Sequence, residues 1–309
     1  MRAALALVVF SVAAPASAQP PVLAELLDTA GRYVRGFEQD FQTVISDETY
    51  VQRERQTRTV NGRTRQTSTV RTIGSETLFM WVKEEQTWLM VRNVLRVDGR
   101  AVPDSRARLE RAIADVGSQG PEASATGSAS LPARPLGFEP LANRFRRLRD
   151  ESARFNLGAI HRNLNDPMLP FQFVDPAFRP RFSFAISGEE SVNGVSTWKL
   201  TFAEHTAPTV VTVDGRDSLA NGAIWITASG VVLRTQLDLT NPATSLTSSI
   251  AVTYGRDPKL AGWVPMRMEE TYTQRPSSAG AGHGIDISCV ATYSNFRRFV
   301  TSGRVVVPR

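Results

Sequence analysis

The side chains that most often carry catalysis or hold metals are few and scattered in this 309-residue sequence. Its three histidines are His161, His205 and His283. None of them stands in a His-Glu-x-x-His motif, whose spacing puts two imidazoles on one face of a zinc-binding helix. Glu204 directly precedes His205, and neighbours on a strand point to opposite faces of the sheet. The histidines therefore predict no metal site and no cofactor.

Paired carboxylates offer the other candidate chemistry, because glycosidases use two of them together. The pairs are Glu189-Glu190 and Glu269-Glu270, and strand alternation would separate the two members of each pair. A hydrolase that uses Glu190, His205 and Glu270 needs these three side chains to meet in one cleft. The sequence has neither a Gly-x-Ser-x-Gly nucleophile elbow nor a glycine-rich phosphate loop. We therefore predict no catalytic residues and favour a binding protein over an enzyme.

The N-terminus predicts export. Arg2, the apolar run at 3–14 and Ala16-Ser17-Ala18 make the three parts of a cleavable signal peptide over residues 1–18. We expect the mature chain, 19–309, to be periplasmic in a Gram-negative-type bacterium or secreted, and not to span the membrane. The one cysteine, Cys289, cannot form an internal disulfide. We expect it to fill core space, with a reactive thiol as the alternative.

The net charge of +6 is carried almost wholly by arginine, since the lysines are Lys83, Lys199 and Lys259. A basic patch could recruit nucleic acid or an anionic membrane surface. The sequence, however, has no dense basic block with interleaved aromatic residues. We predict that the charges are spread over solvated strand faces and that the chain has no nucleic-acid partner.

The hydrophobic period changes along the chain and predicts which elements position these side chains. Apolar residues from Leu23 to Phe41 recur at three- and four-residue steps and predict a helix with one buried face. The period then becomes two, which predicts strands, with Asn61-Gly62 as the strongest hairpin signal. These early strands are expected at 43–60, 63–72, 77–82 and 87–97.

A section between the two strand regions breaks this pattern. We expect a short helix at 105–116, a flexible insert at 117–134 and an inserted helix at 138–160. Strands return from Arg181 onward, separated by turns such as Ser229-Gly230. A sheet of only the first four strands would expose both of its edges, so we predict one antiparallel sheet of about eleven strands, with the helices as its cover. The fold class is therefore α+β.

The residue patterns of one strand and one hairpin are similar to those of a known family. The strand Val195–Phe202, with Trp198 and Leu200, and the hairpin Ile224-Trp225-Ile226, Ser229-Gly230 and Val231–Arg234 resemble the LolA-like family. Its members are periplasmic carriers of outer-membrane lipoproteins and relatives that bind lipids or other acylated partners. The resemblance implies that the sheet curves into an incomplete β-barrel with an apolar concave face, lidded by helices.

A curved sheet that faces helices can leave an apolar cavity for acyl chains. Methionine and aromatic side chains suit such a cavity because they repack around ligands of varied shape. The alternative is that the same side chains fill a closed core. The candidate lining residues are Leu78, Met80, Trp88, Met90, Trp198, Leu200, Phe202, Trp225, Leu233, Met266 and Met268.

The leading hypothesis is a periplasmic, non-enzymatic binding protein for an apolar or acylated ligand, either a lipid or a lipoprotein. Arg144, Arg146 and Arg147 could meet anionic head groups at the mouth of the cavity, or could form a solvated helix face. A second hypothesis is an envelope signalling or scaffold protein that binds a protein partner with the same fold. The hydrolase is the third hypothesis.

Overall fold

A computed structural model of the chain describes residues 22–40, 43–61, 63–82, 87–118, 146–160, 162, 165–213, 216–241, 244–275 and 282–298. The predicted signal peptide lies outside these residues, as does the predicted insert from residue 119 onward. The helices are α1 (Leu23–Asp40), α2 (Ser105–Ser118), α4 (Arg146–Ala153), α5 (Phe171–Val174) and the 3-10 helix η1 (Arg179–Arg181).

Most of the described chain forms one antiparallel sheet of eleven strands in the order β4-β3-β2-β1-β13-β12-β11-β10-β9-β6-β5. A separate ribbon pairs β7 (Thr212–Val213) with β8 (Arg216–Asp217). The strands of the large sheet are β1 (Thr43–Val60), β2 (Arg63–Val82), β3 (Thr87–Val97), β4 (Arg100–Ala101), β5 (Phe182–Val192), β6 (Val195–Glu204), β9 (Ala220–Ile226), β10 (Val232–Asn241), β11 (Leu246–Asp257), β12 (Gly262–Gln274) and β13 (Gly282–Arg298).

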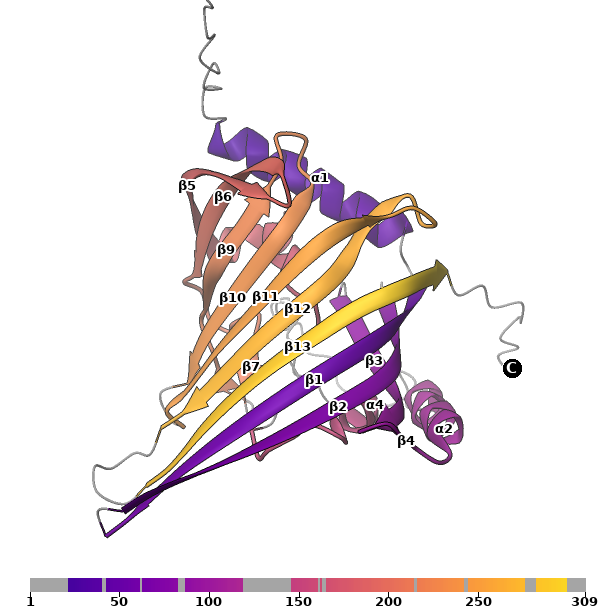
Figure 1. Cartoon of the computed structure of the whole chain (residues 1–309). Coiled ribbons are helices and arrows are strands. Elements are labelled where there is room, and N and C mark those ends of the chain that lie inside the picture. The colour runs from indigo at the N-terminus through magenta and orange to yellow at the C-terminus, as the bar shows by residue number, and fades with distance from the viewer. Residues whose placement is uncertain are drawn as a thin grey trace, which may run out of the picture.

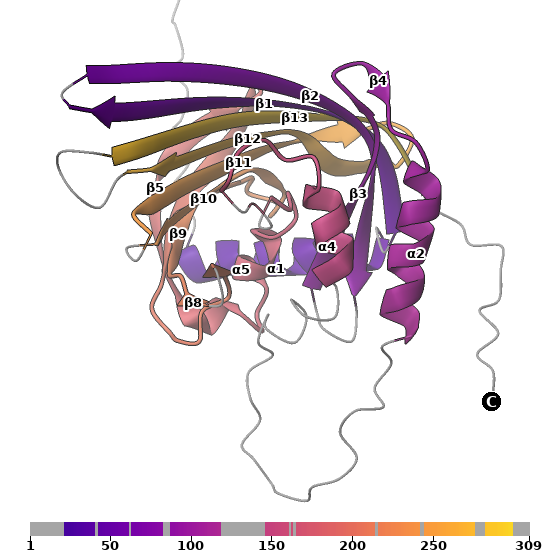
Figure 2. The ribbon, with the colours of Figure 1, turned by 90° about the horizontal axis from the view of Figure 1, so that it is seen from below.

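The sheet curves without closing, which confirms the predicted incomplete barrel with a helical cover. Figure 1 shows the strands running side by side, with α1 across one end, and Figure 2 shows the sheet arching over α1, α4 and α5. Register shifts interrupt the pairing at Ile45, Ser75, Gly188, Leu233 and Tyr254. Such bulges bend a strand and increase its twist, so they account for the curvature.

Two predicted elements differ in extent from the observed ones. Strands predicted separately at 63–72 and 77–82 form the single strand β2, because β1 pairs without a break from Arg63 to Met80. The inserted helix predicted at 138–160 corresponds to α4, which ends at Ala153, while its predicted first part, 138–145, lies outside the described residues. Beyond it the chain turns toward the sheet, and Gly158 has a φ of +83°.

The core lies between α1 and the concave face. The buried face of α1 is as predicted, since Leu26, Ala30, Val34 and Phe37, at steps of three and four residues, are all buried. The helix approaches its neighbours closely at Gly31, where an added Cβ would lie 3.2 Å from Pro176 Cδ and 3.3 Å from the carbonyl oxygen of Val174. Large side chains of the sheet and of α5 complete this core around α1.

The edge of the sheet at β3 is covered rather than open. The backbone N–H of Arg92 donates to Ser152 Oγ of α4 at 2.9 Å, and the N–H of Met90 donates to the carboxylate of Asp166. Helix α2 packs beside α4 and β3. Side-chain acceptors thus take the place of a further strand along this part of the edge, which prevents pairing there with another chain.

Candidate functional site

An aromatic cluster joins α1 to the concave face. Phe37 of α1 packs against Trp88 of β3 at 5.6 Å between ring centroids and against Phe171 of α5 at 5.2 Å. Phe171 in turn lies 4.9 Å from the ring of Tyr254 in β11. Aromatic rings carry much of the apolar area in such contacts and adapt their stacking geometry to neighbours. The short helix α5 and the long helix α1 therefore share a single apolar interface with the sheet.

A small apolar gap in the packing lies inside this interface, next to Phe37. It is entirely apolar and has no room for a water molecule, so it is dry. Two of its walls, Phe37 and Met168, belong to the covering segments, and the others belong to the sheet. We call this space the α1 void; its lining residues are Phe37, Val44, Phe79, Trp88, Met168, Val264 and Phe296.

The predicted cavity residues fall into three groups instead of one. The first group packs with the main core on the concave side: Trp88, Met90, Trp198, Leu200, Phe202 and Met268. In the second group, Leu78 and Met80 alternate with Phe79 and pack on the other side of β2, in the cluster that contains Leu89 and Val91 of β3. In the third group, Trp225 and Leu233 form a small cluster with Trp263. Met266 is 39% exposed. Of the predicted set, only Trp88 lines the α1 void.

Charged and polar side chains are buried along the middle of the concave face. Arg92 of β3 and Glu48 of β1 form an ion pair with two hydrogen bonds, at 2.5 and 2.8 Å, and both side chains are almost fully buried. Arg92 also lies 4.6 Å from the ring centroid of Tyr50. Paired in this way, each charge compensates the other in a region from which water is excluded.

Arg162 reaches the same wall from the irregular segment after α4. Its guanidinium donates to Gln52 Oε1 at 2.5 Å, to the carbonyl oxygen of Leu157 at 2.8 Å and to Cys289 Sγ at 2.9 Å. Burial raises the pKa of the Cys289 thiol to about 12, with the nearby Glu270 adding to the rise and Arg162 opposing it. The thiol is therefore protonated at neutral pH, which disfavours the reactive alternative.

Glu270 of β12 completes this buried polar cluster. Tyr272 donates to its Oε2 at 2.6 Å, while Oε1 has no hydrogen-bond partner in the described part of the chain. Burial raises the pKa of Glu270, although Tyr272 and the guanidinium of Arg162 lower it. We define the buried polar cluster as Glu48, Tyr50, Gln52, Arg92, Arg162, Glu270, Tyr272 and Cys289.

The residues of the hydrolase hypothesis do not meet. Glu190 accepts hydrogen bonds from Trp225 Nε1 at 2.7 Å and Lys199 Nζ at 3.1 Å, so it lies on the side of the sheet opposite the main core. Glu270 is buried on the concave side beside Tyr272, and His205 is exposed. Across the described ranges, no cluster of three histidine, cysteine or acidic side chains could hold a metal ion.

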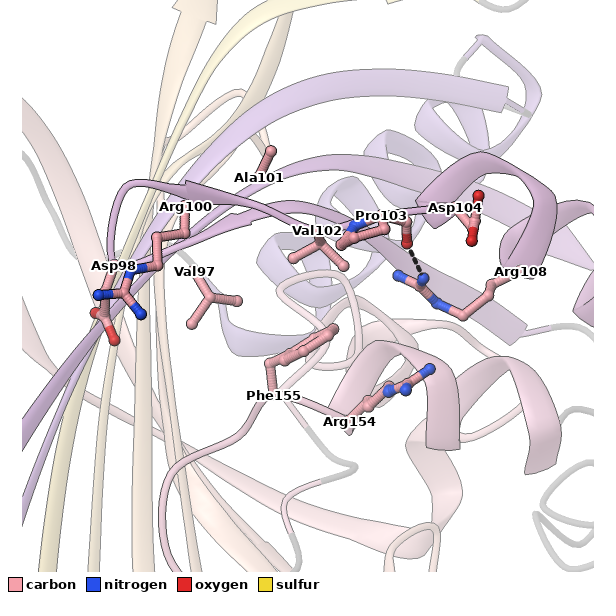
Figure 3. Close-up of a pocket in the computed structure, with 10 residues that line it drawn as sticks. All are labelled: Val97, Asp98, Arg100, Ala101, Val102, Pro103, Asp104, Arg108, Arg154 and Phe155. Atoms are coloured by element: carbon pink, nitrogen blue, oxygen red, sulfur yellow. Dashed lines mark hydrogen bonds between the residues drawn. The ribbon is translucent and has the colours of Figure 1, made fainter.

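A second concavity opens on the surface near the β3–β4 turn, with a volume of about 740 Å³. In Figure 3, Val102 faces Phe155 across it, with Arg108 and Arg154 at one end and Arg100 at the other. Arg108 is held by Glu151 of α4 at 2.8 Å. The lining residues are Val97, Asp98, Arg100, Ala101, Val102, Pro103, Asp104, Arg108, Arg154 and Phe155.

Three solved structures are similar to this chain over nearly its whole length. A DUF1329 family protein from Desulfovibrio piger has 13% identity and a TM-score of 0.32, covering 91% of this chain and 95% of its own. A domain described as an outer membrane lipoprotein-sorting protein, from Vibrio parahaemolyticus, has 9% identity and a TM-score of 0.30, covering 90% and 94%. A LolA superfamily protein from Nitrosomonas europaea has 9% identity and a TM-score of 0.28, covering 91% and 95%.

At such identities and TM-scores these similarities carry no argument about family, role or ligand. The sequence matches no family model and no curated protein. Among the described helices, none has the length and apolar character needed to cross a membrane.

The buried polar cluster is the part of the interior that sequence reasoning missed. A signal for Arg92 exists, because it interrupts the apolar run Leu89-Met90-Val91 in a strand. Arg162 carries no such signal, since it lies in an irregular segment far from Gln52 and Cys289 in the sequence. Of the arginines predicted to meet head groups, Arg144 and the side chains of Arg146 and Arg147 lie outside the described residues.

Glu38, near the end of α1, predicts a pH dependence of stability. Burial raises its pKa from 4.5 to about 8, with the Asp175 carboxylate adding to the rise and Arg35 opposing it. Between these two pH values the unfolded chain releases the proton and the folded chain keeps it, so rising pH favours unfolding. We expect Glu38→Gln to make the free energy of unfolding less dependent on pH in this window.

Urea unfolding of the wild type and of Glu38→Gln, at several values between about pH 5 and pH 9, measures this difference. Glu25→Gln is the matched control, because Glu25 is exposed on the first turn of the same helix. Parallel pH profiles for the wild type and Glu38→Gln would contradict the assignment.

Proposed function

We propose that this chain is an exported envelope protein that binds an apolar or acylated ligand between α1 and the concave face of its sheet. The observation that supports this proposal most directly is the α1 void, a dry apolar space at a contact between a helix and the sheet. A cavity too small for water leaves its lining side chains without contacts on one side. An alkyl chain that enters would restore those contacts and enlarge the space by moving Phe37 and Met168.

The gain from binding an alkyl chain can be compared with the cost of moving α1. Burying one methylene contributes about 0.8 kcal/mol, so about ten methylenes would contribute roughly 8 kcal/mol before the cost of opening. Among the described residues, one ion pair joins α1 to another element: Asp28 pairs with Arg179 of η1 at 2.8 Å, and both are partly exposed. Partly exposed pairs of this kind contribute about 1 kcal/mol or less.

The ligand would meet the main-core members of the predicted set. We assign Trp88 to the first contact, because it lines the α1 void, and Met90 and Met268 to the wall beyond it, since both pack in the same core. Leu78, Met80, Trp225, Leu233 and Met266 face away from this core, so we assign them no ligand contact. The buried polar cluster would bound the apolar space toward the middle of the sheet.

One experiment tests whether the α1 void takes the ligand. A fluorescent eighteen-carbon fatty acid is titrated into the wild type, Met168→Trp and Met266→Trp. Met168 lines the void, so its replacement by tryptophan occupies the space that the ligand would take, and we expect affinity to fall about tenfold or more, or roughly 1.4 kcal/mol. Met266→Trp adds the same side chain at an exposed position and is expected to leave binding unchanged.

Native mass spectrometry and lipid extraction of protein purified gently from the periplasm complete this test. Circular dichroism establishes that each variant is folded. Recovery of no lipid, together with equal affinity of the two tryptophan variants for the probe, would exclude the α1 void as a ligand site.

A further inference from the structure

The strand β2 is longer than its neighbour on one side. β2 pairs with β1 from Arg63 to Met80, whereas β3 pairs with β2 only from Ile73 to Val82. Residues 63–72 therefore have β1 on one side and no strand of the described chain on the other. Figures 1 and 2 show β1, β2 and β13 extending together beyond the body of the molecule.

The free side of this segment presents backbone hydrogen-bonding groups. Thr72 points away from β1, because its N–H donates to Asp98 Oδ1 at 2.7 Å and its carbonyl oxygen accepts from the Asp98 N–H at 2.8 Å. Backbone groups two residues apart in a strand point the same way. The pairing of β1 with β2 has no register shift, so Val70, Ser68, Gln66 and Thr64 also present their N–H and carbonyl groups outward.

Arginines concentrate on one face of the same segment. Arg58 of β1 lies opposite Arg65 of β2, and Arg63 is two residues farther along on the same face. None of the three takes part in an ion pair within the described part of the chain. Arg71 shares this face and donates to the carbonyl oxygen of Phe155 at 3.1 Å. Arg58, Arg63 and Arg65 therefore place positive charge beside the free edge with no ion-pair partner among the described residues, and Glu54 lies farther along the same face, opposite Thr69.

This charge decides between two occupants of the edge. A second copy of the chain, paired antiparallel about Thr67, would place Arg63 opposite Arg71 of the other copy, and like charges directly opposite one another destabilise a strand pair. A strand that carries carboxylates would instead pair its charges with Arg58, Arg63 and Arg65. The long basic edge thus disfavours self-pairing and favours an acidic partner.

We propose that residues 63–72 of β2 dock an extended acidic segment of a partner protein, which adds to the sheet as a further antiparallel strand. Outward backbone groups supply the hydrogen bonds, and the three arginines select for acidic side chains at alternate positions. This interaction surface is separate from the α1 void and does not depend on the proposed ligand.

The test uses the full mature chain and a fluorescein-labelled peptide of alternating glutamate and valine, ten residues long, with a lysine–valine peptide as its charge-reversed counterpart. Binding is followed by fluorescence anisotropy at low and moderate salt. We expect the acidic peptide to bind, the lysine peptide not to bind, and the affinity for the acidic peptide to fall as salt is raised.

Two sets of variants separate backbone pairing from charge. Ser68→Pro removes one outward N–H and leaves the ladder to β1 intact, while Ser68→Thr keeps that N–H. Reversing Arg58, Arg63 and Arg65 to glutamate removes the charge, and Arg256→Glu in β11 is the control at an exposed arginine remote from this edge. We expect Ser68→Pro and the triple reversal each to weaken binding about tenfold or more, and both controls to bind as the wild type.

Several outcomes would overturn the proposal. They are absence of acidic-peptide binding, equal binding of the lysine peptide, or equal affinity of Ser68→Pro and Ser68→Thr. Binding to vesicles of phosphatidylglycerol that Ser68→Pro leaves unchanged, without peptide binding, would make an anionic membrane the occupant instead. Gln66→Pro removes the next outward N–H and replaces Ser68→Pro if that variant does not fold.

Discussion

Replacing Arg92 with methionine is expected to lower the free energy of unfolding by about 3–5 kcal/mol. The change leaves the Glu48 carboxylate without its partner at a position where both side chains are almost fully buried. Desolvating a charge without compensation costs far more than the ion pair itself contributes. Urea unfolding at fixed pH measures the difference.

A double-mutant cycle with Glu48→Leu identifies the cause of this loss. Because the double variant removes both charges, we expect it to be much more stable than Arg92→Met alone. Arg106→Met is the matched control, since Arg106 and Glu110 form an ion pair whose side chains are 89% and 65% exposed, and such pairs contribute about 1 kcal/mol or less. Similar decreases in the free energy of unfolding for Arg92→Met and Arg106→Met would show that burial of the Arg92–Glu48 pair does not increase the cost of removing one partner.

Replacing Gly230 with alanine is expected to displace α1 and to lower the free energy of unfolding by about 2–4 kcal/mol. Gly230 has a φ of +87°, and an added Cβ would lie 2.6 Å from the backbone carbonyl carbon and oxygen of Thr29 in α1. Neither the backbone of the turn nor that of the helix can move away cheaply. Faster hydrogen exchange of the α1 amides would report the displacement, and urea unfolding would report its energy.

Gly36→Ala is the matched control for this variant and should have the opposite sign. An added Cβ at Gly36 meets nothing within 4 Å, and alanine is favoured over glycine inside a helix by about 1 kcal/mol. We therefore expect Gly36→Ala to stabilise the chain slightly. Unchanged exchange of the α1 amides in Gly230→Ala would contradict the close contact between the turn and the helix.

Local patterns predicted most of the fold because they reflect local physics. The stripe on α1, the Asn61-Gly62 hairpin and the alternating strands all follow from side-chain period and turn chemistry. The sequence predicts Ser229-Gly230 as a turn, and the structure adds two requirements for glycine there: a φ of +87° and the close approach of Thr29. That contact joins elements distant in sequence, so no local pattern could indicate it.

The candidate site was less predictable for a related reason. Alternation tells which residues of one strand share a face, but it does not tell which face is concave. Leu78 and Trp88 were grouped as cavity residues, although neighbouring strands place them on opposite sides of the sheet. Trp225 is an apolar residue that the sequence places in the cavity, yet it packs on the opposite side of the sheet from the main core. There, Lys199 Nζ and Arg234 Cζ lie 5.1 and 4.9 Å from the centroid of its ring.

The pairing of β1 with β13 determines when the sheet can be completed during folding. These two strands come from opposite ends of the described sequence and lie side by side inside the sheet, with β2–β4 on one flank and β5–β12 on the other. Until β13 is available, the chain can form only two separate groups of strands with unpaired edges. Contacts of such long sequence separation form slowly, so a chain synthesised from its N-terminus would remain open to chaperones and proteases until its last strand arrives.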